Sequence, residues 1–410
     1  MTWPLCRIDD IAEIFDGPHA TPKSTKTATS GPYFLGISSL DSGRLNLSLS
    51  PHLSEDDFEK WSRRTTPRHG DVVFSYETRL GQAALIPRGF HGVLGRRMAL
   101  MRPDLRRVTP GFLLYYFLSP RFQDVIRQRA VTGSTVDRIL LTEFPDYPIH
   151  VPPLPEQQGI ATTLGALDDK IESARRQSNS INGMQHALWK HAALRANHKR
   201  PLLDFTSPLL GGTPKRTNQD YWGGDICWAS VRDMTSAEQG IVTGTSEHIA
   251  QPAVDSAARH RPHPAGSVFL TARGTVGRVV TNAVPCAINQ SAYAFSSEVR
   301  KSALLRLAIE SSVDHLRQLA HGSTFDAITT RDIAEMCVPD LDQPAFLDIE
   351  DTLQSLEELR FSLASQALKA SVLRDALLPE LMSGRIRVPE AREAVEGAVG
   401  SPEEDNDDDS

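Results

Sequence analysis

The sequence contains few cysteines and no long run of apolar residues. Its four cysteines, Cys6, Cys227, Cys286 and Cys337, are scattered without a Cys-x-x-Cys pair, so neither a zinc site nor a disulfide framework is predicted. No apolar stretch approaches the roughly 18 residues of a membrane-spanning helix, and the N-terminal residues lack the apolar segment of a signal peptide. We therefore expect a cytosolic protein without a membrane segment.

The catalytic signatures of DNA-processing enzymes are also missing. There is no GxxxxGK[ST] loop for ATP-driven movement and no Asn-Pro-Pro-Tyr or Asp-Pro-Pro-Tyr motif for methylating a base. Asp146 with Asp168-Asp169-Lys170 follows a nuclease's carboxylate-x-Lys pattern only loosely. The latter three residues fall between helical core positions, which favours a solvated helix face. His260 and His263 lack a neighbouring ligand, which favours a polar loop. We expect a non-catalytic chain with no metal and no cofactor.

The formal net charge of −7 is concentrated towards the end of the sequence. Residues 390–410 hold nine acidic side chains and one basic side chain, and the rest of the chain is nearly neutral. A run of like charges with little apolar area cannot form a core, so a disordered acidic tail is predicted for residues 390–410. Net charge neither supports nor excludes a nucleic-acid partner, because only the clustering of basic side chains decides that.

What the sequence does contain is one order of short motifs that occurs twice, about 190 residues apart. Thr21-Pro22-Lys23 is repeated as Thr213-Pro214-Lys215, and Gly133-Ser134-Thr135 is repeated as Gly322-Ser323-Thr324. Solenoid repeats have periods of about 20–50 residues. This longer period therefore predicts a duplicated domain, and two similar readers suggest recognition of something in two separated parts.

Two segments carry apolar residues at alternating spacings of three and four, which predicts coiled-coil helices. The core positions of the first segment are Leu164, Leu167, Ile171, Ile181 and Leu188, and those of the second are Leu353, Leu356, Leu363 and Leu377. Register-setting polar residues often interrupt such seams, and here they are Ser178, Gln185, Arg360 and Arg374. We expect the helices to pack on each other. The alternative is two amphipathic helices that pack separately on their own domains.

The two globular halves, residues 1–150 and 201–337, show mixed strand and helix patterns. Short β-rich runs such as Val72-Val73-Phe74 and Val268-Phe269-Leu270 lie between Gly and Pro turns. Helices are predicted at Gly111–Arg129 and Ser302–Leu319. The sequence therefore predicts an α+β fold with two similar mixed domains and two long helices.

A series of motifs in the second half resembles one known family. The motifs are Gly211-Gly212-Thr213-Pro214, Tyr221-Trp222-Gly223-Gly224-Asp225-Ile226-Cys227-Trp228, Thr271-Ala272-Arg273-Gly274-Thr275-Val276-Gly277, Ile288-Asn289-Gln290 and Gly322-Ser323-Thr324. In the first half, Pro152-Pro153-Leu154-Pro155-Glu156-Gln157 opens the first helix. In this order the motifs resemble those of the specificity subunits of type I restriction-modification systems. The first half departs from the pattern at Asp16–Lys23, which replaces the GGTP turn, and at Thr78–Gln82, which replaces the Arg-Gly-x-x-Gly loop.

The resemblance implies a domain organisation and a set of partners. Two target-recognition domains, 1–150 and 201–337, would each read one half of a bipartite, asymmetric double-stranded DNA site. Two spacer helices, within 151–200 and 338–389, would form an antiparallel coiled coil that docks two methyltransferase subunits. A restriction motor-nuclease subunit would join for cleavage, and the acidic tail at 390–410 lies outside the resemblance.

Candidate DNA-binding residues follow from the side chains that form bidentate bonds to base edges. In the first domain they are Lys23, Arg79, Gln82, Arg96, Arg97 and Arg138. In the second domain they are Lys215, Arg216, Arg232, Arg273, Arg278, Asn289 and Gln290. Hydroxyls at Ser134, Thr135, Ser323 and Thr324 are candidates for phosphate contacts. For each residue the alternative is a solvated surface side chain, or for the hydroxyls a structural turn.

Two other functions remain open from the sequence. One is a DNA-recognition subunit of a different modification or phage-defence complex that has another catalytic partner. The other is a self-sufficient nuclease or a coiled-coil scaffold. Adjacent methyltransferase and helicase-nuclease genes would support the type I assignment, and metal-dependent cleavage by the isolated chain would support the nuclease.

Overall fold

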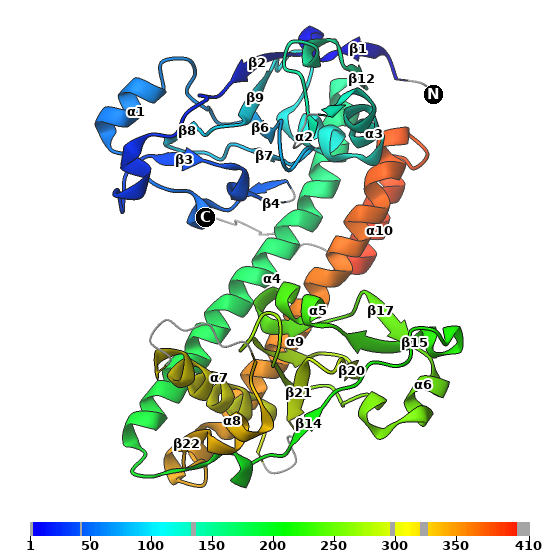
Figure 1. Ribbon diagram of the computed structural model, residues 1–410. Coiled ribbons are helices and arrows are strands. Elements are labelled where there is room, and N and C mark those ends of the chain that lie inside the picture. Colours follow the sequence, from blue (N-terminus) through cyan, green and yellow to red (C-terminus); the bar gives the residue numbers. More distant parts are fainter. Residues whose placement is uncertain (1–2, 42, 133–136, 296–299, 320–326, 400–410) are drawn as a thin grey trace, which may run out of the picture. The chain divides into compact units, whose positions relative to one another are not determined.

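The computed structural model describes residues 3–41, 43–132, 137–295, 300–319 and 327–399 (Figure 1). The chain forms two units, one made of Met1–Asp169 with Ala370–Ser410 and the other of Lys170–Lys369. Each unit contains one globular half and a pair of segments from the two long helices. The candidate residues in 133–136 and 320–326, which are Ser134, Thr135, Ser323 and Thr324, lie outside the described residues.

A four-stranded antiparallel sheet forms the centre of the first unit. Its strands, in the order β2-β9-β6-β7, are Ala12–Asp16, Met98–Pro103, Val72–Ser75 and Ala83–Leu85. Beside it, β3 (Tyr33–Leu35) pairs in parallel with β8 (Gly92–Leu94). The shorter antiparallel pairs are β1 (Leu5–Arg7) with β12 (Pro148–His150), β4 (Leu40–Asp41) with β5 (Arg44–Leu45), and β10 (Val131–Thr132) with β11 (Asp137–Arg138). The only helix before residue 100 among the described α-helices is α1 (Glu55–Trp61).

The second unit repeats this arrangement. Its main sheet, in the order β14-β21-β18-β19-β16, contains Pro208–Leu210, Ala292–Phe295, Val268–Thr271, Val279–Asn282 and Ile241–Val242. The parallel pair here is β15 (Trp222–Ala229) with β20 (Cys286–Ile288), and β17 (Glu247–Ile249) flanks β15. The closing strands are β13 (Lys199–Pro201) and β22 (Cys337–Pro339), and the short helices are α5 (Val231–Ser236), α6 (Gln251–Ser256) and α8 (Thr330–Glu335). The shared strand order is what a duplicated domain predicts.

The helices that cover the two sheets differ in one respect. The second unit has one helix, α7 (Ser302–Leu319), as predicted. The first has two, α2 (Pro110–Leu118) and α3 (Pro120–Arg129), so the prediction of one helix over 111–129 is wrong. The break lies at Ser119, whose backbone is extended (ψ 145°) because a following proline disfavours the helical conformation. The Ser119 hydroxyl then accepts a hydrogen bond from the Phe122 amide at 3.4 Å and caps α3.

The two long helices are α4 (Leu154–Arg195) and α9 (Pro344–Ser383). In the first unit Asp168 of α4 accepts a hydrogen bond from Arg374 of α9 at 2.7 Å, and in the second unit Gln185 donates to the Leu353 carbonyl at 3.0 Å. Trp189, one turn beyond Gln185, packs against Phe346 in a tilted arrangement with ring centroids 5.0 Å apart. Residue numbers thus rise along one helix as they fall along the other, so the helices are antiparallel partners. This confirms the predicted fold class.

The residues predicted at the heptad core positions are buried or half-buried. Leu188 and Leu356 are half-buried, and the other named positions are buried: Leu164, Leu167, Ile171, Ile181, Leu353, Leu363 and Leu377. The prediction of a solvated face at Asp168-Asp169-Lys170 is wrong for Asp168, which is 8% exposed and also accepts a hydrogen bond from the Tyr115 hydroxyl at 2.7 Å. Asp169 is exposed. Asp168 therefore ties α2 and α9 to α4.

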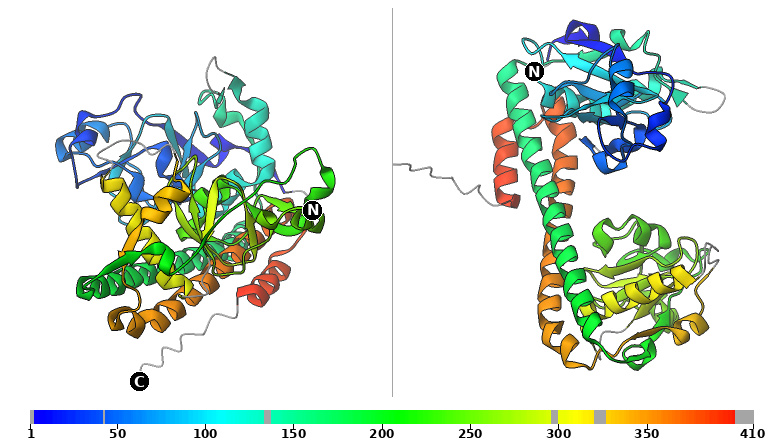
Figure 2. Two further views of the ribbon diagram at one scale, coloured as in Figure 1. Left: turned by 60° about the horizontal axis from the view of Figure 1, so that its bottom comes forward. Right: turned by 90° about the vertical axis from the view of Figure 1, so that its left-hand side faces the viewer.

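The prediction of disorder from residue 390 is also wrong for the first ten residues. Residues Val388–Val399 form a helix, α10, that runs beside α4 (Figure 2). Ala391 is fully buried and Val395 is 8% exposed, and Arg387 donates to Glu156 of α4 at 3.2 Å. Apolar residues at this spacing give α10 one face that packs on the first unit. Glu390, Glu393 and Glu396 remain exposed on the other face. The tail beyond residue 399 lies outside the described part of the chain.

Candidate nucleic-acid interface

Three loops of the second unit meet at one edge of its sheets. They are the loop 211–218 after β14, the loop 272–278 between β18 and β19, and the turn 289–291 between β20 and β21. Gly211 donates its amide to Ala292 at 3.1 Å, and the Ala272 amide donates to Ser291 at 2.7 Å. The Thr213 hydroxyl also donates to the side chain of Gln290. Segments far apart in the sequence therefore share one surface.

Glycine at position 211 is required by the closeness of these loops. A Cβ atom there would lie 2.3 Å from the Asn289 carbonyl oxygen, a distance that side chains do not tolerate. The next carbonyl, of Gly212, accepts a hydrogen bond from the Trp228 indole at 3.0 Å. This packing fixes the loop that presents Lys215, whose side chain is exposed.

Arg216 is held by its own unit. Its guanidinium stacks over Trp222 at 3.8 Å and over Trp228 at 5.2 Å. Both of its terminal nitrogens bond to the carboxylate of Glu247, one of them at 2.9 Å. The hydrogen bond from Arg216 holds the pKa of Glu247 below its usual value. Both terminal nitrogens of Arg216 are thus engaged with Glu247. Through these contacts Arg216 links the loop 211–218 to β15 and β17.

Arg232 and Arg273 present side chains to solvent from neighbouring elements. Arg232 lies in α5, which begins at the Ser230–Asp233 capping box. The loop with Arg273 passes beside this helix, because a Cβ built on Gly274 would lie 3.6 Å from Val231. Arg232 and Arg273 are exposed, as are Lys215 and Gln290 on the adjoining loops. These four side chains form the candidate interface of the second unit.

Two other predicted residues face the protein. Asn289 is half-buried, and its side-chain oxygen accepts a hydrogen bond from the Ser291 amide at 3.1 Å. Arg278 is half-buried and donates to the Ala237 carbonyl at 3.2 Å, while its amide donates to the Thr271 hydroxyl at 2.9 Å. Asn289 holds the β20–β21 turn, and Arg278 ties loop 272–278 to the segment after α5.

The first unit builds the same edge from equivalent loops. The Tyr76 amide donates to the Arg97 carbonyl at 3.2 Å, as the Ala272 amide does to Ser291. The Ser75 hydroxyl donates to the Arg79 carbonyl, as the Thr271 hydroxyl does to Thr275. The turn glycine of each loop has a left-handed backbone, with φ of 77° at Gly81 and 81° at Gly277. The loop Thr78–Gln82 therefore keeps the fold of the motif from which its sequence departs.

The charge at this edge differs between the units. Glu77 occupies the position of Arg273, since both precede a left-handed residue, Thr78 at φ 69° and Gly274 at φ 78°. The Arg97 guanidinium pairs with Glu77 at 2.8 Å and donates to the Thr78 hydroxyl at 3.2 Å. Arg138 forms a backbone bridge with Glu77. Glu77 thus holds Arg97 in place. It also puts a negative charge where the second unit has the positive charge of Arg273.

The remaining candidates of the first unit lie as follows. Arg79 and Arg96 are exposed, and Arg138 is exposed beside the bridge to Glu77. Gln82 is half-buried at the position that corresponds to Arg278. Lys23 is exposed in a short turn, Lys23–Lys26, that is tied to α1 through a hydrogen bond from Ser24 to Asp57. The turn that carries Lys23 is therefore anchored to α1.

Sequence reasoning missed the side chains that position the cations. These are Trp222, Trp228, Glu247 and Glu77. The tryptophans lie in a motif already noted, Tyr221–Trp228, and two aromatic rings close to an arginine-bearing loop are a usable signal for cation–π stacking. Glu247 is 31 residues from Arg216, and no local pattern points to that pair.

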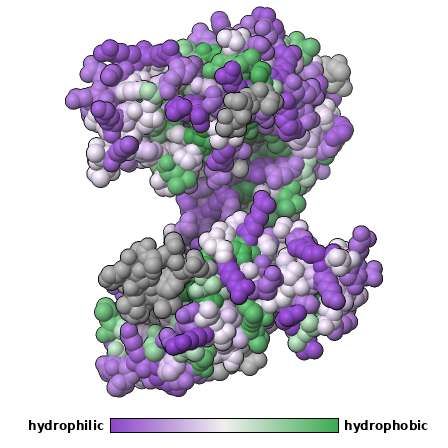
Figure 3. Space-filling view, viewed as in Figure 1, coloured by the Kyte–Doolittle hydropathy of each residue, from purple (hydrophilic) through white to green (hydrophobic). Residues whose placement is uncertain are grey.

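Within the described residues, no three His, Cys, Asp or Glu side chains are grouped so as to hold a metal ion. None of the described helices has both the length and the apolar character needed to cross a lipid bilayer. Hydrophilic side chains cover much of the face of each unit drawn in Figure 3, and interfaces with nucleic acid are generally polar and charged.

The sequence of the chain is similar to known proteins over part of its length. Residues 1–182 match the family described as "Type I restriction modification DNA specificity domain". The type I restriction enzyme MjaIX specificity subunit of Methanocaldococcus jannaschii is 26% identical over 146 residues, which cover 34% of this chain and 33% of that protein. The type I restriction enzyme HindI specificity subunit of Haemophilus influenzae is 23% identical over 191 residues, 46% of this chain and 41% of that protein. The chain thus spans less than half the length of these curated relatives.

The fold itself has a solved counterpart. The crystal structure of the S subunit of a type I restriction-modification system from M. genitalium superimposes with a TM-score of 0.61 at 12% sequence identity. The superposition covers 93% of this chain and 96% of that one. At this level of identity the match concerns the fold.

Proposed function

We propose that this chain, a member of the family of type I restriction-modification specificity subunits, recognises a bipartite, asymmetric double-stranded DNA site without itself catalysing a reaction. Residues 1–150 and 201–337 would each read one half of the site. The antiparallel helices within 151–200 and 338–389 would dock two methyltransferase subunits, and motor-nuclease subunits would join for cleavage.

The observation that carries the proposal is the same loop edge built twice with different side chains. Equivalent backbone hydrogen bonds hold both edges, at Tyr76–Arg97 and at Ala272–Ser291. The exposed groups nevertheless differ, since Arg96 in one unit corresponds to Gln290 in the other. Arginine pairs best with guanine, whereas glutamine pairs with adenine. Two readers with a common scaffold and different reading groups suit an asymmetric site.

Electrostatics supports the same conclusion. Lys215, Arg232 and Arg273 are exposed cations on adjoining elements of the second unit. Phosphate contacts by such side chains provide much of the affinity for DNA and make it depend on salt. Base contacts from the same loops would then provide the sequence preference.

The proposal is tested by co-expressing the chain with a type I methyltransferase subunit and mapping methylated bases in the host genome. We expect one motif made of two fixed half-sites separated by an unread gap. Cells that express a chain with Lys215, Arg232 and Arg273 all changed to alanine should lose methylation at this motif. Chains with three exposed residues of α10 changed to alanine, Glu390, Glu393 and Glu396, serve as the control.

Methylation of an uninterrupted motif, or methylation that does not depend on this chain, would contradict the proposal. Metal-dependent cleavage of DNA by the purified chain alone would contradict its non-catalytic part. If this chain directed a different catalytic partner to a bipartite site, its proposed role in DNA recognition would stand. The proposed type I complex would be wrong.

A further inference from the structure

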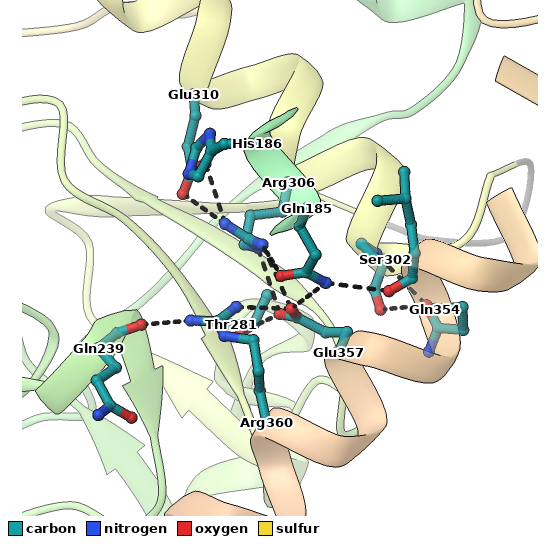
Figure 4. Close-up of polar contacts among 12 residues, drawn as sticks. Gln185, His186, Gln239, Thr281, Ser302, Arg306, Glu310, Gln354, Glu357 and Arg360 are labelled. Atoms are coloured by element: carbon teal, nitrogen blue, oxygen red, sulfur yellow. Dashed lines mark hydrogen bonds and ion pairs between the residues drawn. The ribbon is translucent and has the colours of Figure 1, made fainter. Parts of the chain in front are cut away.

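One carboxylate in the second unit collects hydrogen bonds from four elements (Figure 4). Glu357 of α9 has no exposed side-chain surface. It accepts hydrogen bonds from Gln185 of α4 at 3.1 Å, from Arg360 of α9 at 2.6 Å, and from Thr281 of β19 at 3.0 Å. Arg306 of α7 contacts both of its oxygens at 3.3 Å. The cluster therefore joins both long helices to the recognition sheet and its covering helix.

The cluster is closed by further contacts of its cations. Arg306, 3% exposed, donates two bonds of 3.0 Å to Glu310 and one of 2.8 Å to Gln185. Arg360, 1% exposed, donates to the backbone carbonyl of Gln239 at 2.6 Å. Two arginines and two glutamates balance in charge. Such a pairing offsets part of the cost of burying each ion but seldom gives more stability than well-packed apolar residues would.

What the cluster does give is directional contacts to the segments that present the candidate reading groups. Thr281 lies in β19, directly after the loop with Arg273. Gln239 lies in a 3₁₀ turn, Glu238–Gly240, which follows α5 and its Arg232. This turn is held from both sides, because Gln239 also donates to the Arg175 carbonyl of α4 at 2.8 Å and Glu238 pairs with the Arg175 side chain at 2.8 Å. Gln239 itself has a left-handed backbone with φ 56°.

The base of the same domain is tied to α9 in a second place. Ser302, the first residue of α7, donates its hydroxyl to Gln354 at 3.1 Å, and the Lys301 amide donates to Glu350 at 2.8 Å. Free amides and positive charge at a helix start attract such acceptors. The N-terminal end of α7 is therefore fixed to α9, in addition to the contacts that Arg306 makes.

We propose that the cluster of Gln185, Arg306, Glu357 and Arg360 is a positioning device that holds the second recognition domain at one angle on its helix pair and so restricts the gap length that the protein accepts. This inference rests on the proposed function. Non-directional apolar contacts alone permit small rotations of a domain on a helix pair, whereas hydrogen bonds from four elements to one carboxylate select one orientation.

Two mild substitutions test the device. Arg360→Lys keeps the charge but lacks the second arm that reaches Gln239, and Thr281→Val keeps the shape but loses the bond to Glu357. The matched controls are Arg331→Lys, at a side chain of α8 that is 88% exposed, and Thr66→Val, at an exposed position of the first domain, both outside the long helices. Each variant is expressed with the methyltransferase subunits, and its folding is checked by thermal unfolding of the purified complex.

The readout is the methylation of plasmids that carry both half-sites with the cognate gap or with a gap one base pair longer or shorter. We expect both cluster variants to methylate the cognate gap with unchanged half-site preference. The ratio of off-length to cognate methylation should rise roughly fivefold, the effect of one lost hydrogen bond on an orientational equilibrium. The controls should keep the wild-type ratio.

An unchanged ratio in folded Arg360→Lys and Thr281→Val complexes would overturn the inference. Loss of folded complex in both variants would overturn it too, because the cluster would then support folding rather than orientation. If the wild-type protein directed methylation to no bipartite site, the proposed function itself would fail, and this result differs from the other two.

Discussion

Arg273 and Arg278 lie five residues apart in one loop, yet their side chains meet different surroundings. Arg273 is exposed, whereas Arg278 is half-buried and donates to the Ala237 carbonyl. A charged group that already serves the fold is a poor candidate for reading DNA, because a base contact would first have to break the internal bond. We therefore predict a role in DNA binding for Arg273 and a role in stability for Arg278.

We expect Arg273→Ala to weaken specific binding by about 1–3 kcal/mol, the effect of one lost base contact, and to leave stability unchanged. Arg278→Ala should instead lower the free energy of unfolding of the second unit by about 1–2 kcal/mol through its lost hydrogen bond. Fluorescence anisotropy with DNA that contains the site, at several salt concentrations, and urea unfolding measure the two effects. Equal loss of affinity in two equally stable variants would contradict this assignment.

The stability of the folded protein should depend on pH through the carboxylate of Glu357. Burial opposes its charge, but Arg306 and Arg360 outweigh burial, so its pKa lies below the ordinary value of 4.5. The unfolded chain therefore binds the proton more readily than the folded one. The stability that this carboxylate contributes is present above pH 4.5 and is lost as pH falls through the lower, folded value.

Glu357→Gln should cost about 3–5 kcal/mol at neutral pH, because it leaves two buried guanidinium groups short of a partner. The difference between wild type and variant should narrow as the pH falls below 4.5. Urea unfolding of both proteins at pH 7, 5 and 4 measures it. A difference that stays constant over this range would mean that Glu357 is not the group that titrates.

Residue types alone indicated which side chains could meet DNA, but not which were already engaged. The pair of Arg216 and Glu247 and the pair of Arg97 and Glu77 bring together residues that are 31 and 20 positions apart. Such pairs depend on how strands align, and no local spacing encodes them. Arg273 is exposed in its loop, as its place in a glycine-containing motif suggests, and its contact with DNA stays a prediction.

Among the helices, α10 shows where composition misled. Its acidic side chains suggested a disordered tail, but Ala391 and Val395 lie four residues apart and are buried in the first unit. The apolar spacing outweighs the charge, because Glu390, Glu393 and Glu396 all remain in solvent. The break between α2 and α3 was, by contrast, readable from Ser119-Pro120, a cap followed by a residue suited to the first turn.

We expect Ala391→Arg to detach α10, since a large charged side chain cannot be accommodated at a fully buried position without a cost of about 1–3 kcal/mol or more. Ala394→Arg, on the exposed face of the same helix, should have little effect. Limited trypsin digestion, followed by mass spectrometry, would show faster cleavage after Arg385 and Arg387 in the first variant. Equal cleavage rates in the two variants would mean that α10 does not depend on this contact.

For the molecule as a whole, duplication made the fold predictable. Repeated motifs implied two similar domains, and both units have the same strand order around β9 and β21. The parallel pairs β3–β8 and β15–β20 could not be foreseen, because β3, β8 and β20 have three residues each and the paired strands lie nearly 60 residues apart. Heptad spacing predicted the paired helices, since a periodic pattern over many turns averages out local exceptions.

At this scale we predict that the two readers are independent. Exchanging residues 1–150 for the corresponding domain of a relative should change one half-site and leave the other intact. The junction lies between β12, which ends at His150, and α4, which begins at Leu154, so no described element is cut. Mapping of methylated bases gives the result directly. A change in both half-sites would contradict independence.

The strand pair β13–β22 closes the second domain at its base. Lys199–Pro201 pairs with Cys337–Pro339, and the Asp340 amide bonds to the His198 carbonyl at 2.9 Å. The chain therefore leaves α4 and returns to α9 at neighbouring points. In genetic terms, the codons between these points would behave as a cassette, since one crossover on each side would replace the domain and keep the codons of both helices. If the domain reads DNA as proposed, a lineage that acquired such a cassette would gain a new DNA preference in one event, while the surfaces of α4 and α9 would be inherited unchanged.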